Sequence, residues 1–266
     1  MNKSLVQQKF GAHAAAYATS TVHAKGASLG RLVELVKPER QWEALDIATG
    51  AGHTAAAFAP HVAHVIASDI TREMLDEAAK LATSKGLANM ETAHADAEAL
   101  PFADGRFDLV TSRIAPHHFP DVPKFVAEVS RVLKPGGVFA LVDNIAPDAQ
   151  STPGFSAGEL HDAALTYNTF EKLRDPSHGR CLGMEEWSEV VRGAGFSILH
   201  TERLPKDMEF DPWAGRMDAD AATVTRLRSM LTDGSPALRA FLKPRLEAGK
   251  LWFTLDEVIL IARKPA

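Results

Sequence analysis

The chain has little cysteine, no long apolar run and no excess of positive charge, and each absence excludes a class of protein. Its single cysteine, Cys181, cannot form an intramolecular disulfide or build a cysteine-rich metal cluster. No run of about 18 apolar residues occurs, and the N-terminal segment lacks the apolar core of a signal peptide. We therefore expect a soluble, cytoplasmic protein without stable membrane insertion. The net charge of −5 also argues against a broad nucleic-acid surface.

Short apolar runs alternate with helical patterns from about Glu43 to Asn144. This alternation, with strands that are apolar nearly throughout, predicts βαβ units and a parallel sheet with helices on both faces. The predicted strands of this region are WEALDIAT (42–49), HVIASD (64–69), METAHAD (90–96), RFDLVTSR (106–113) and GGVFALVDN (136–144). Two further strands, SILHTERL (197–204) and LWFTLDEVILIARK (251–264), follow mainly helical segments.

The exit of the first predicted strand is where a ligand is expected, because ligands of open α/β sheets bind at the carboxyl ends of the strands. It reads LDIATGAGHTAA, in which Gly50 and Gly52 allow a sharp turn and a close backbone approach. The stretch from Gly50 to Ala55 also fits the GxGxxG/A dinucleotide fingerprint, and Asp69 follows at the distance of a ribose-binding acid. The turn alone therefore leaves open a NAD-type oxidoreductase, and equally a turn without any ligand.

Three acids, one near the exit of each of the first three strands, narrow the choice of ligand. Asp46 would repel a pyrophosphate and suits a cationic group. S-adenosylmethionine (SAM) carries a sulfonium and an ammonium beside a ribose that suits Asp69. Asp96 can accept from an adenine amino group, while the amide of Ala97 can donate to a ring nitrogen. Each acid alone is common as a strand-end or turn-capping carboxylate, but the three together favour SAM.

Four stretches between about Glu43 and Asp143 carry a resemblance to a known family: LDIATGAGHTA, ASDITREML, HADAEALPFADGRFDLV and EVSRVLKPGGVFALVD. In this order and spacing the chain resembles the class I SAM-dependent methyltransferases, in particular the group similar to ubiquinone/menaquinone C-methyltransferases and their uncharacterised bacterial small-molecule relatives. The resemblance implies a Rossmann-like α/β fold with a seven-stranded, mostly parallel sheet, an antiparallel last strand and helical lid segments. It also implies SAM as cofactor, S-adenosylhomocysteine as product and a small-molecule acceptor, with C- or O-methylation favoured.

The resemblance assigns the cofactor site residue by residue. The glycine turn and Asp46 would lie under the methionine half of SAM, and Asp69 would hold the ribose hydroxyls. The family commonly has glycine at the first position of the turn, where this chain has Ala48, a change small enough to preserve binding. The implied cofactor residues are Tyr17, Asp46, Ala48, Gly50, Gly52, Asp69, Ile70, Met74, Asp96, Ala97 and Arg113.

The stretch RIAPHHFPD (113–121) follows the fourth strand, beside the expected sulfonium. His117 and His118 are the catalytic candidates, because imidazole can move a proton near neutral pH. A base is needed only if the acceptor arrives protonated, as an alcohol, phenol or acidic carbon. In the alternative interpretation, one ring packs over SAM and the other caps the loop, so we do not expect the two to act as equals.

We predict a single methyltransferase domain over residues 1–266. Its parts are an N-terminal cap (1–40), a SAM-binding core (41–144), two lid insertions (145–183 and 207–248) and the rest of the sheet (184–206 and 249–266). Candidate contacts of the acceptor are His13, Asp143, Asn144, Arg174 and His178. The 11 histidines show no HExxH or comparable spacing, so no metal site is predicted.

Other functions stay open at this point. Asp46 and the lack of a recognisable dehydrogenase catalytic set argue against a NAD-type Rossmann oxidoreductase. A SAM-binding protein without catalytic activity is a third hypothesis. Nucleic-acid methylation is disfavoured, because the fourth strand exits into SRIAPHH and not into the [DN]PP[YF] signature. The Arg- and Met-rich segment 207–248 suits an apolar substrate or a partner subunit, so a homodimer also stays open.

Overall fold

A computed structural model of the chain describes residues 3–18, 26–216 and 219–266, with the side chains at positions 13 and 15–18 outside the described part. The strands are β1 (Glu43–Ile47), β2 (His64–Asp69), β3 (Met90–His94), β4 (Phe107–Arg113), β5 (Leu133–Asn144), β6 (Ser197–Glu209), β7 (Arg245–Glu247) and β8 (Lys250–Arg263). The helices of the first half are α1 (Lys3–Ala18), α3 (Ala27–Val36), α4 (His53–Phe58), η1 (Ala59–His61), α5 (Arg72–Ser84), η2 (Pro116–His118) and α6 (Val122–Val132). Those of the second half are α7 (Ala157–Arg174), α8 (Met184–Gly193), α9 (Phe210–Gly215), α10 (Ala221–Thr232) and α11 (Pro236–Leu242).

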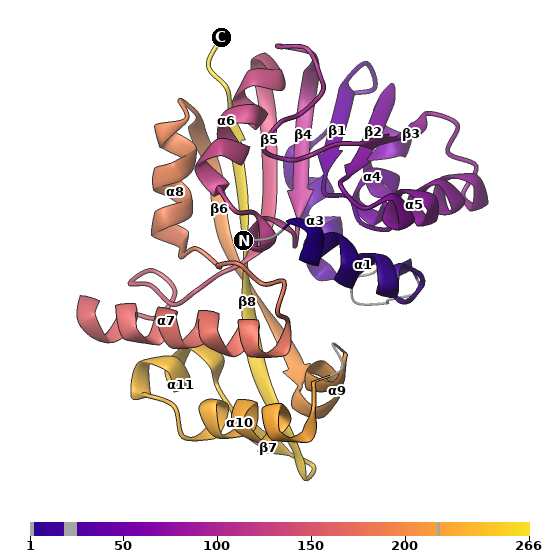
Figure 1. Cartoon of the computed structure of the whole chain (residues 1–266). Coiled ribbons are helices and arrows are strands. Elements are labelled where there is room, and N and C mark those ends of the chain that lie inside the picture. Colours follow the sequence, from indigo (N-terminus) through magenta and orange to yellow (C-terminus); the bar gives the residue numbers. More distant parts are fainter. Residues whose placement is uncertain (1–2, 19–25, 217–218) are drawn as a thin grey trace. The chain divides into compact units, whose positions relative to one another are not determined.

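The strands form one sheet in the order β3–β2–β1–β4–β5–β8–β6, and the short β7 pairs with β8 (Figure 1). The pairs β1–β2, β2–β3, β1–β4 and β4–β5 are parallel. The chain thus runs outward from β1 to β3 and resumes on the other side of β1 with β4. This reversal between β1 and β4 is the kind of place where open α/β sheets bind ligands.

The last strand runs against the central ones. The amide of Gly136, near the start of β5, donates to the carbonyl of Lys264 at 2.9 Å, whereas that of Ile145, just past its end, donates to Asp256 at 3.0 Å. Partner numbers fall along β8 as they rise along β5, so the two strands are antiparallel. The prediction of a seven-stranded, mostly parallel sheet with an antiparallel last strand is confirmed, and the structure adds β7.

Burial explains which strands were easy to recognise. β1, β2 and β4 are buried along almost their whole length, as strands covered on both faces require. β3 lies at the edge of the sheet, and only Met90 of its five residues is buried, which accounts for its weak apolar pattern. The helix α6 begins after Asp121, whose carboxylate caps it by accepting the amide of Lys124 at 2.9 Å.

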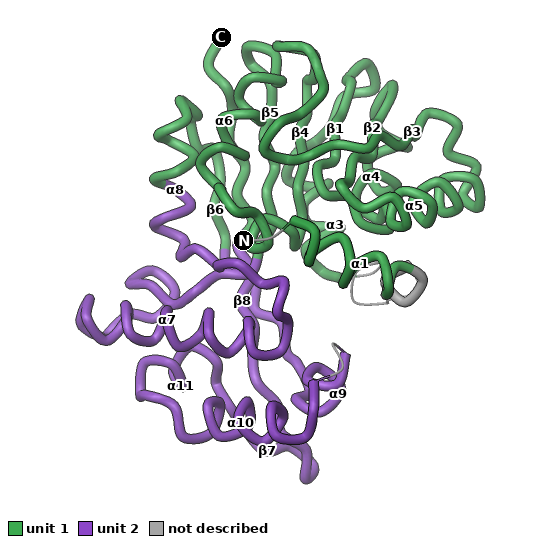
Figure 2. The backbone as a smooth tube through the Cα atoms, viewed as in Figure 1, with its two compact units in different colours: residues 1–143, 189–202, 259–266 green, residues 144–188, 203–258 purple. Residues whose placement is uncertain are grey.

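The chain divides into two compact units (Figure 2). Unit 1 comprises residues 1–143, 189–202 and 259–266, and unit 2 comprises residues 144–188 and 203–258. Unit 2 has an aromatic core of its own, in which Phe170 stacks on Trp213 with ring centroids 4.8 Å apart. The predicted lid insertions fall within unit 2, and their role as lids stays a prediction. None of the helices in the described ranges has the length and apolar character needed to span a bilayer.

Candidate functional site

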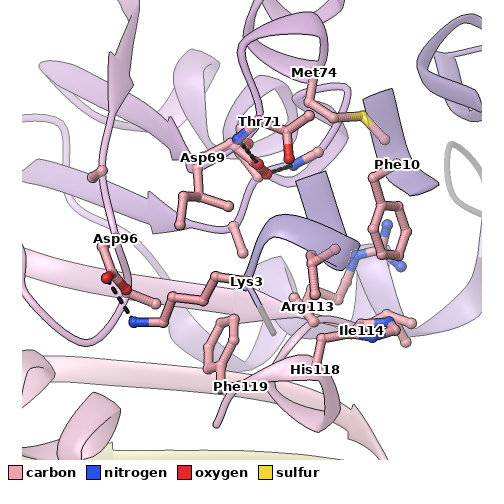
Figure 3. A pocket seen from close by; sticks show the side chains of 18 of the residues that line it. Lys3, Phe10, Asp69, Thr71, Met74, Asp96, Arg113, Ile114, His118 and Phe119 are labelled. Atoms are coloured by element: carbon pink, nitrogen blue, oxygen red, sulfur yellow. Dashed lines mark hydrogen bonds and ion pairs between the residues drawn. The ribbon is translucent and has the colours of Figure 1, made fainter. Parts of the chain in front are cut away.

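A pocket in unit 1 lies where β1, β2, β3 and β4 end, with α1 along one side (Figure 3). Nine of the predicted site residues line it, contributed by four different strand exits and by α5. They are Ala48, Gly50, Asp69, Ile70, Met74, Asp96, Ala97, Arg113 and His118. The sequence therefore predicted a set of residues that the fold gathers around one cavity.

Asp46 lies beneath the glycine turn and is only 1% exposed. One carboxylate oxygen accepts the Thr49 hydroxyl at 2.5 Å and the Ala55 amide at 3.2 Å, and the other accepts the Thr111 hydroxyl at 2.6 Å. Burial raises its pKa to about 6, although these hydrogen bonds and the charge of Arg113 act in the opposite direction. Asp46 thus stabilises the turn through its hydrogen bonds. It does not line the pocket, so it can act on a ligand there only through the electrostatic effect of its charge.

The turn itself is built from positive φ angles. Ala48, Gly50 and Gly52 have φ of 53°, 54° and 86°. Only glycine adopts this region without steric cost. A residue with a Cβ there destabilises the folded state by about 1–2 kcal/mol. The glycine that the family pattern has at position 48 therefore has a conformational reason. Ala48 keeps the same backbone path at some cost in stability.

Asp69 joins the exits of β1 and β2. Its Oδ2 accepts the amide of Gly50 at 2.9 Å, and its Oδ1 accepts the amide of Thr71 at 2.8 Å. The side chain is buried, which raises its pKa despite the two amides. Ile70 and Met74 line the pocket next to it and supply an apolar wall. A carboxylate at the rim of an apolar wall suits a ligand with vicinal hydroxyls beside a flat ring.

Asp96, at the exit of β3, contacts α1. The ammonium of Lys3 lies 2.6 Å from Asp96 Oδ2 and 2.7 Å from Glu98 Oε2, and Figure 3 shows its side chain reaching toward Asp96. Burial opposes ionisation of Asp96, but the hydrogen bond and charge of Lys3 outweigh it, so its pKa is lowered. The other oxygen of Asp96 accepts the amide of Glu98 at 3.0 Å.

Two more contacts hold α1 at the pocket. The side-chain amide of Gln7 donates to the carbonyl of Ile70 at 2.8 Å, and Phe10 meets His118 edge to face with centroids 5.0 Å apart. The described part of α1 thus covers one side of the cavity. The side chains of Tyr17 and His13, predicted to contact cofactor and acceptor, lie outside the described residues.

The two histidines have different surroundings. His117 Nδ1 lies 2.6 Å from Asp143 Oδ1, whereas His118 lines the pocket beside Phe10. Both rings are buried, and their centroids are 4.2 Å apart. Arg113, at the end of β4, lines the pocket and donates to the Thr54 hydroxyl at 3.1 Å.

Three predicted acceptor contacts belong to unit 2, namely Asn144, Arg174 and His178. Arg174 forms an ion pair with Glu171 at 3.1 Å and lies 4.8 Å from the centre of the Trp213 ring. His178 Nε2 lies 3.0 Å from the side-chain oxygen of Asn168. These contacts are internal to unit 2, and a role of the three residues in acceptor binding stays a prediction.

Sequence reasoning missed several residues of the site. The Thr111 hydroxyl comes from β4, and only the pairing of β4 with β1 brings it to Asp46. The Thr49 hydroxyl lies two residues past the end of β1 and reaches back to the same carboxylate. Lys3 had no signal at all, because its distance to Asp96 depends on the docking of α1. Across residues 3–18, 26–216 and 219–266, no group of three or more His, Cys, Asp or Glu side chains is arranged to hold a metal ion.

Comparisons with known proteins identify the family of the chain. Residues 45–141 match the family model described as a methyltransferase domain. The chain is 35% identical over 230 residues to the uncharacterized methyltransferase YcgJ of Bacillus subtilis (strain 168), covering 86% of this chain and 87% of that one. The crystal structure of YcgJ matches with a TM-score of 0.79 at 33% identity, over 90% and 98% of the two chains. A shorter stretch of 106 residues is 40% identical to the ubiquinone/menaquinone biosynthesis C-methyltransferase UbiE of Brucella anthropi, covering 38% and 40% of the two chains.

Proposed function

The chain belongs to the methyltransferase domain family, and from this we propose that it binds SAM in the pocket of unit 1 and methylates a carbon or oxygen atom of a small molecule. The observation that carries the proposal is the placement of Asp69 and Asp96 on one cavity, at the exits of neighbouring parallel strands. The match to a relative named as a C-methyltransferase supports carbon as the receiving atom.

The pocket residues suit each part of SAM. Asp69 would hold the ribose hydroxyls, with Ile70 and Met74 against the adenine or ribose. Asp96 and the amide of Ala97 would read the edge of the adenine. The glycine turn and Arg113 would hold the methionine half, and its cationic groups would then lie above the buried charge of Asp46. A cavity that combines carboxylates with an apolar wall is complementary to a nucleoside that carries a sulfonium.

Bound SAM supplies a methyl group that is already activated by the positive charge of its sulfur. The contribution of the chain is to orient the cofactor and exclude water, which can lower a barrier by up to roughly 7–11 kcal/mol when two reactants are aligned. The contacts of Lys3, Gln7 and Phe10 place α1 where it can close one side of the cavity.

Titration calorimetry with SAM, S-adenosylhomocysteine and NADH tests the cofactor assignment. We expect both sulfur nucleosides to bind and NADH not to bind. Binding of NADH without binding of SAM would refute the assignment. Turnover is then followed as S-adenosylhomocysteine release with candidate acceptors, and binding without release on any acceptor would favour a non-catalytic SAM-binding protein.

The raised pKa of Asp46 predicts that SAM affinity depends on pH. With a pKa of about 6 in the free protein, Asp46 is ionised at pH 7 and mostly protonated at pH 5. Loss of its charge removes the attraction for the cationic half of SAM, so we expect the Kd to rise about tenfold between pH 7 and pH 5. Calorimetry across this range, with Asp46→Asn as the comparison, measures the effect.

Lowering the pH should raise the free energy of unfolding while it weakens SAM binding. The folded-state pKa of Asp46 lies above the value of 3.8 of an ordinary aspartate, so the folded protein binds the proton more tightly than the unfolded chain. The contribution of Asp46 to the free energy of unfolding therefore increases as the pH falls from about 7 toward 4. Asp69 also has a raised pKa, so only the difference between wild type and Asp46→Asn isolates Asp46. An unchanged pH profile in Asp46→Asn would contradict the prediction.

A further inference from the structure

We propose that Lys3 competes with the cofactor for the carboxylate of Asp96, so that the adenine amino group binds by displacing the Lys3 ammonium. The inference rests on the proposed function and adds to it a residue that sets the affinity for SAM and S-adenosylhomocysteine. Its starting point is that the carboxylate proposed to accept the adenine amino group already holds the ammonium of Lys3, which lies 2.6 Å from Asp96 Oδ2.

The two oxygens of Asp96 have different partners. Oδ1 accepts the backbone amide of Glu98 at 3.0 Å, within the turn that follows β3. Oδ2 accepts the ammonium of Lys3, and Figure 3 shows this side chain reaching toward it. The amide of Glu98 cannot move aside without a change in the turn, whereas the ammonium of a lysine sits on a long, flexible stem. Oδ2 is therefore the oxygen that a ligand can take, and Lys3 is the group that it displaces.

The contact between Lys3 and Asp96 lies in the cavity that the cofactor is proposed to fill. Both residues line the pocket, together with Ala97, whose amide is proposed to read the adenine edge. The adenine amino group and the Lys3 ammonium are both donors that need an acceptor oxygen at the same end of this cavity. The ion pair is therefore part of the proposed cofactor site, and binding of the cofactor must change it.

Glu98 gives Lys3 a second partner that the exchange does not remove. Its Oε2 lies 2.7 Å from the ammonium, and its side chain is only 6% exposed. Its Oε1 accepts the backbone amide of Asp121, the cap of α6, at 2.7 Å, which holds the carboxylate in place. Lys3 can thus leave Asp96 and stay with Glu98, so the exchange leaves neither the ammonium nor the buried Glu98 carboxylate unpaired.

The exchange acts at one end of the helix that covers the pocket. Lys3, Gln7 and Phe10 follow one another at helical spacing and share one face of α1. This face carries the contacts of α1 with Asp96, with the carbonyl of Ile70 and with the ring of His118. Only the first of these contacts is exchanged. The adenine end of the cavity can therefore open while α1 still covers its side.

The competition affects both the binding of SAM and the release of its product. SAM binding breaks the contact between Lys3 and Asp96, and the contact forms again when S-adenosylhomocysteine leaves. Lys3 therefore lowers the affinity for both nucleosides and favours release of the product. The side chains of Lys3 and Asp96 are 35% and 33% exposed, so solvent screens the pair. We expect its removal to lower Kd by a factor of about 3 to 5.

The variant Lys3→Met tests the exchange, because methionine keeps an unbranched stem and lacks the charge. Lys134→Met is the matched control, since Lys134 pairs with Asp108 at 2.8 Å and neither residue lines the pocket. The ligands, titrated by calorimetry, are S-adenosylhomocysteine and its analogue with hydrogen in place of the 6-amino group. We expect Lys3→Met to bind S-adenosylhomocysteine about 3 to 5 times more tightly than the wild type does, with the Kd of the analogue unchanged. Lys134→Met should change neither Kd.

Two results of this titration would overturn the exchange. If Lys3→Met binds S-adenosylhomocysteine equally well or more weakly than the wild type, Lys3 does not compete with the cofactor. If both ligands bind more tightly by the same factor, Lys3 obstructs the cavity without competing for Asp96. A wild-type protein that does not bind S-adenosylhomocysteine at all is a different result, because it refutes the proposed function itself.

NMR of protein labelled with ¹³C at the Cε of lysine follows the displaced group directly. The Lys3 signal is identified by its absence from the spectrum of Lys3→Met. We expect S-adenosylhomocysteine to shift this signal and the analogue without the amino group to shift it much less. A Lys3 signal that S-adenosylhomocysteine leaves unchanged, or that both ligands shift equally, contradicts the displacement of Lys3 by the amino group.

Discussion

Replacing Asp69 by asparagine is expected to weaken SAM binding by about a hundredfold or more. The Asp69 carboxylate accepts the amides of Gly50 and Thr71, and in the proposed complex it also accepts the ribose hydroxyls. Asparagine keeps the size of the side chain but turns one acceptor into a donor and removes the charge. Hydrogen bonds to a charged group contribute about 1.5–3 kcal/mol each, and about 1.4 kcal/mol is tenfold in Kd. Titration calorimetry with SAM measures the change.

Asp108 offers a matched control at the opposite end of the sheet. Its Oδ2 accepts the amide of Glu43 at 2.9 Å and the ammonium of Lys134 at 2.8 Å, so it too ties a backbone amide to a carboxylate. It does not line the pocket. Asp108→Asn should therefore lower stability somewhat and leave the Kd of SAM within about twofold. Equal losses of affinity in the two variants would mean that Asp69 acts only on the fold.

The central strands were predictable because burial on both faces leaves a clear mark in the sequence. β2 begins and ends at the predicted residues, and β1, β4 and β8 differ from prediction by one or two residues at an end. β5 begins three residues earlier than predicted, at Leu133, because Leu133 pairs with Phe107 across an irregularity in the register. A proline and two glycines resemble a turn, but here they lie inside a strand that is held by its neighbours. Strand pairing, which the local sequence does not contain, decides such cases.

The candidate site was predictable where it follows strand exits. Asp69 and Asp96 each end a predicted strand, and parallel strands bring their exits to one edge of the sheet. The contact between His117 and Asp143 was not predictable, because it depends on how the loop after β4 folds back on β5. The division into two units likewise depends on contacts between segments far apart in the chain. Residues 145–183 and 207–248 were recognisable only as departures from the alternating pattern.

Gly52→Ala is expected to destabilise the protein by about 3 kcal/mol or more. Gly52 has a φ of 86°, and the backbone strain of an alanine at this angle destabilises the folded state by about 1–2 kcal/mol. A Cβ at this position would also lie 2.9 Å from the Cβ and 3.1 Å from the Cα of Ala78 in α5. Because a Cα cannot move without its helix, relief of this overlap requires a shift of α5, and overpacking of this kind costs typically 1–3 kcal/mol. The midpoint of urea unfolding should fall accordingly.

The variant Gly50→Ala separates the backbone strain of the turn from the overpacking against α5. Gly50 also has a positive φ, 54°, but a Cβ there would have no atom within 4 Å. The chain already holds an alanine under the same condition, since Ala48 has a φ of 53°. Gly50→Ala should therefore cost only about 1 kcal/mol, the loss due to backbone strain. If the two variants unfold at the same urea concentration, the packing of Gly52 against α5 contributes nothing, and backbone angle alone explains the glycines of this turn.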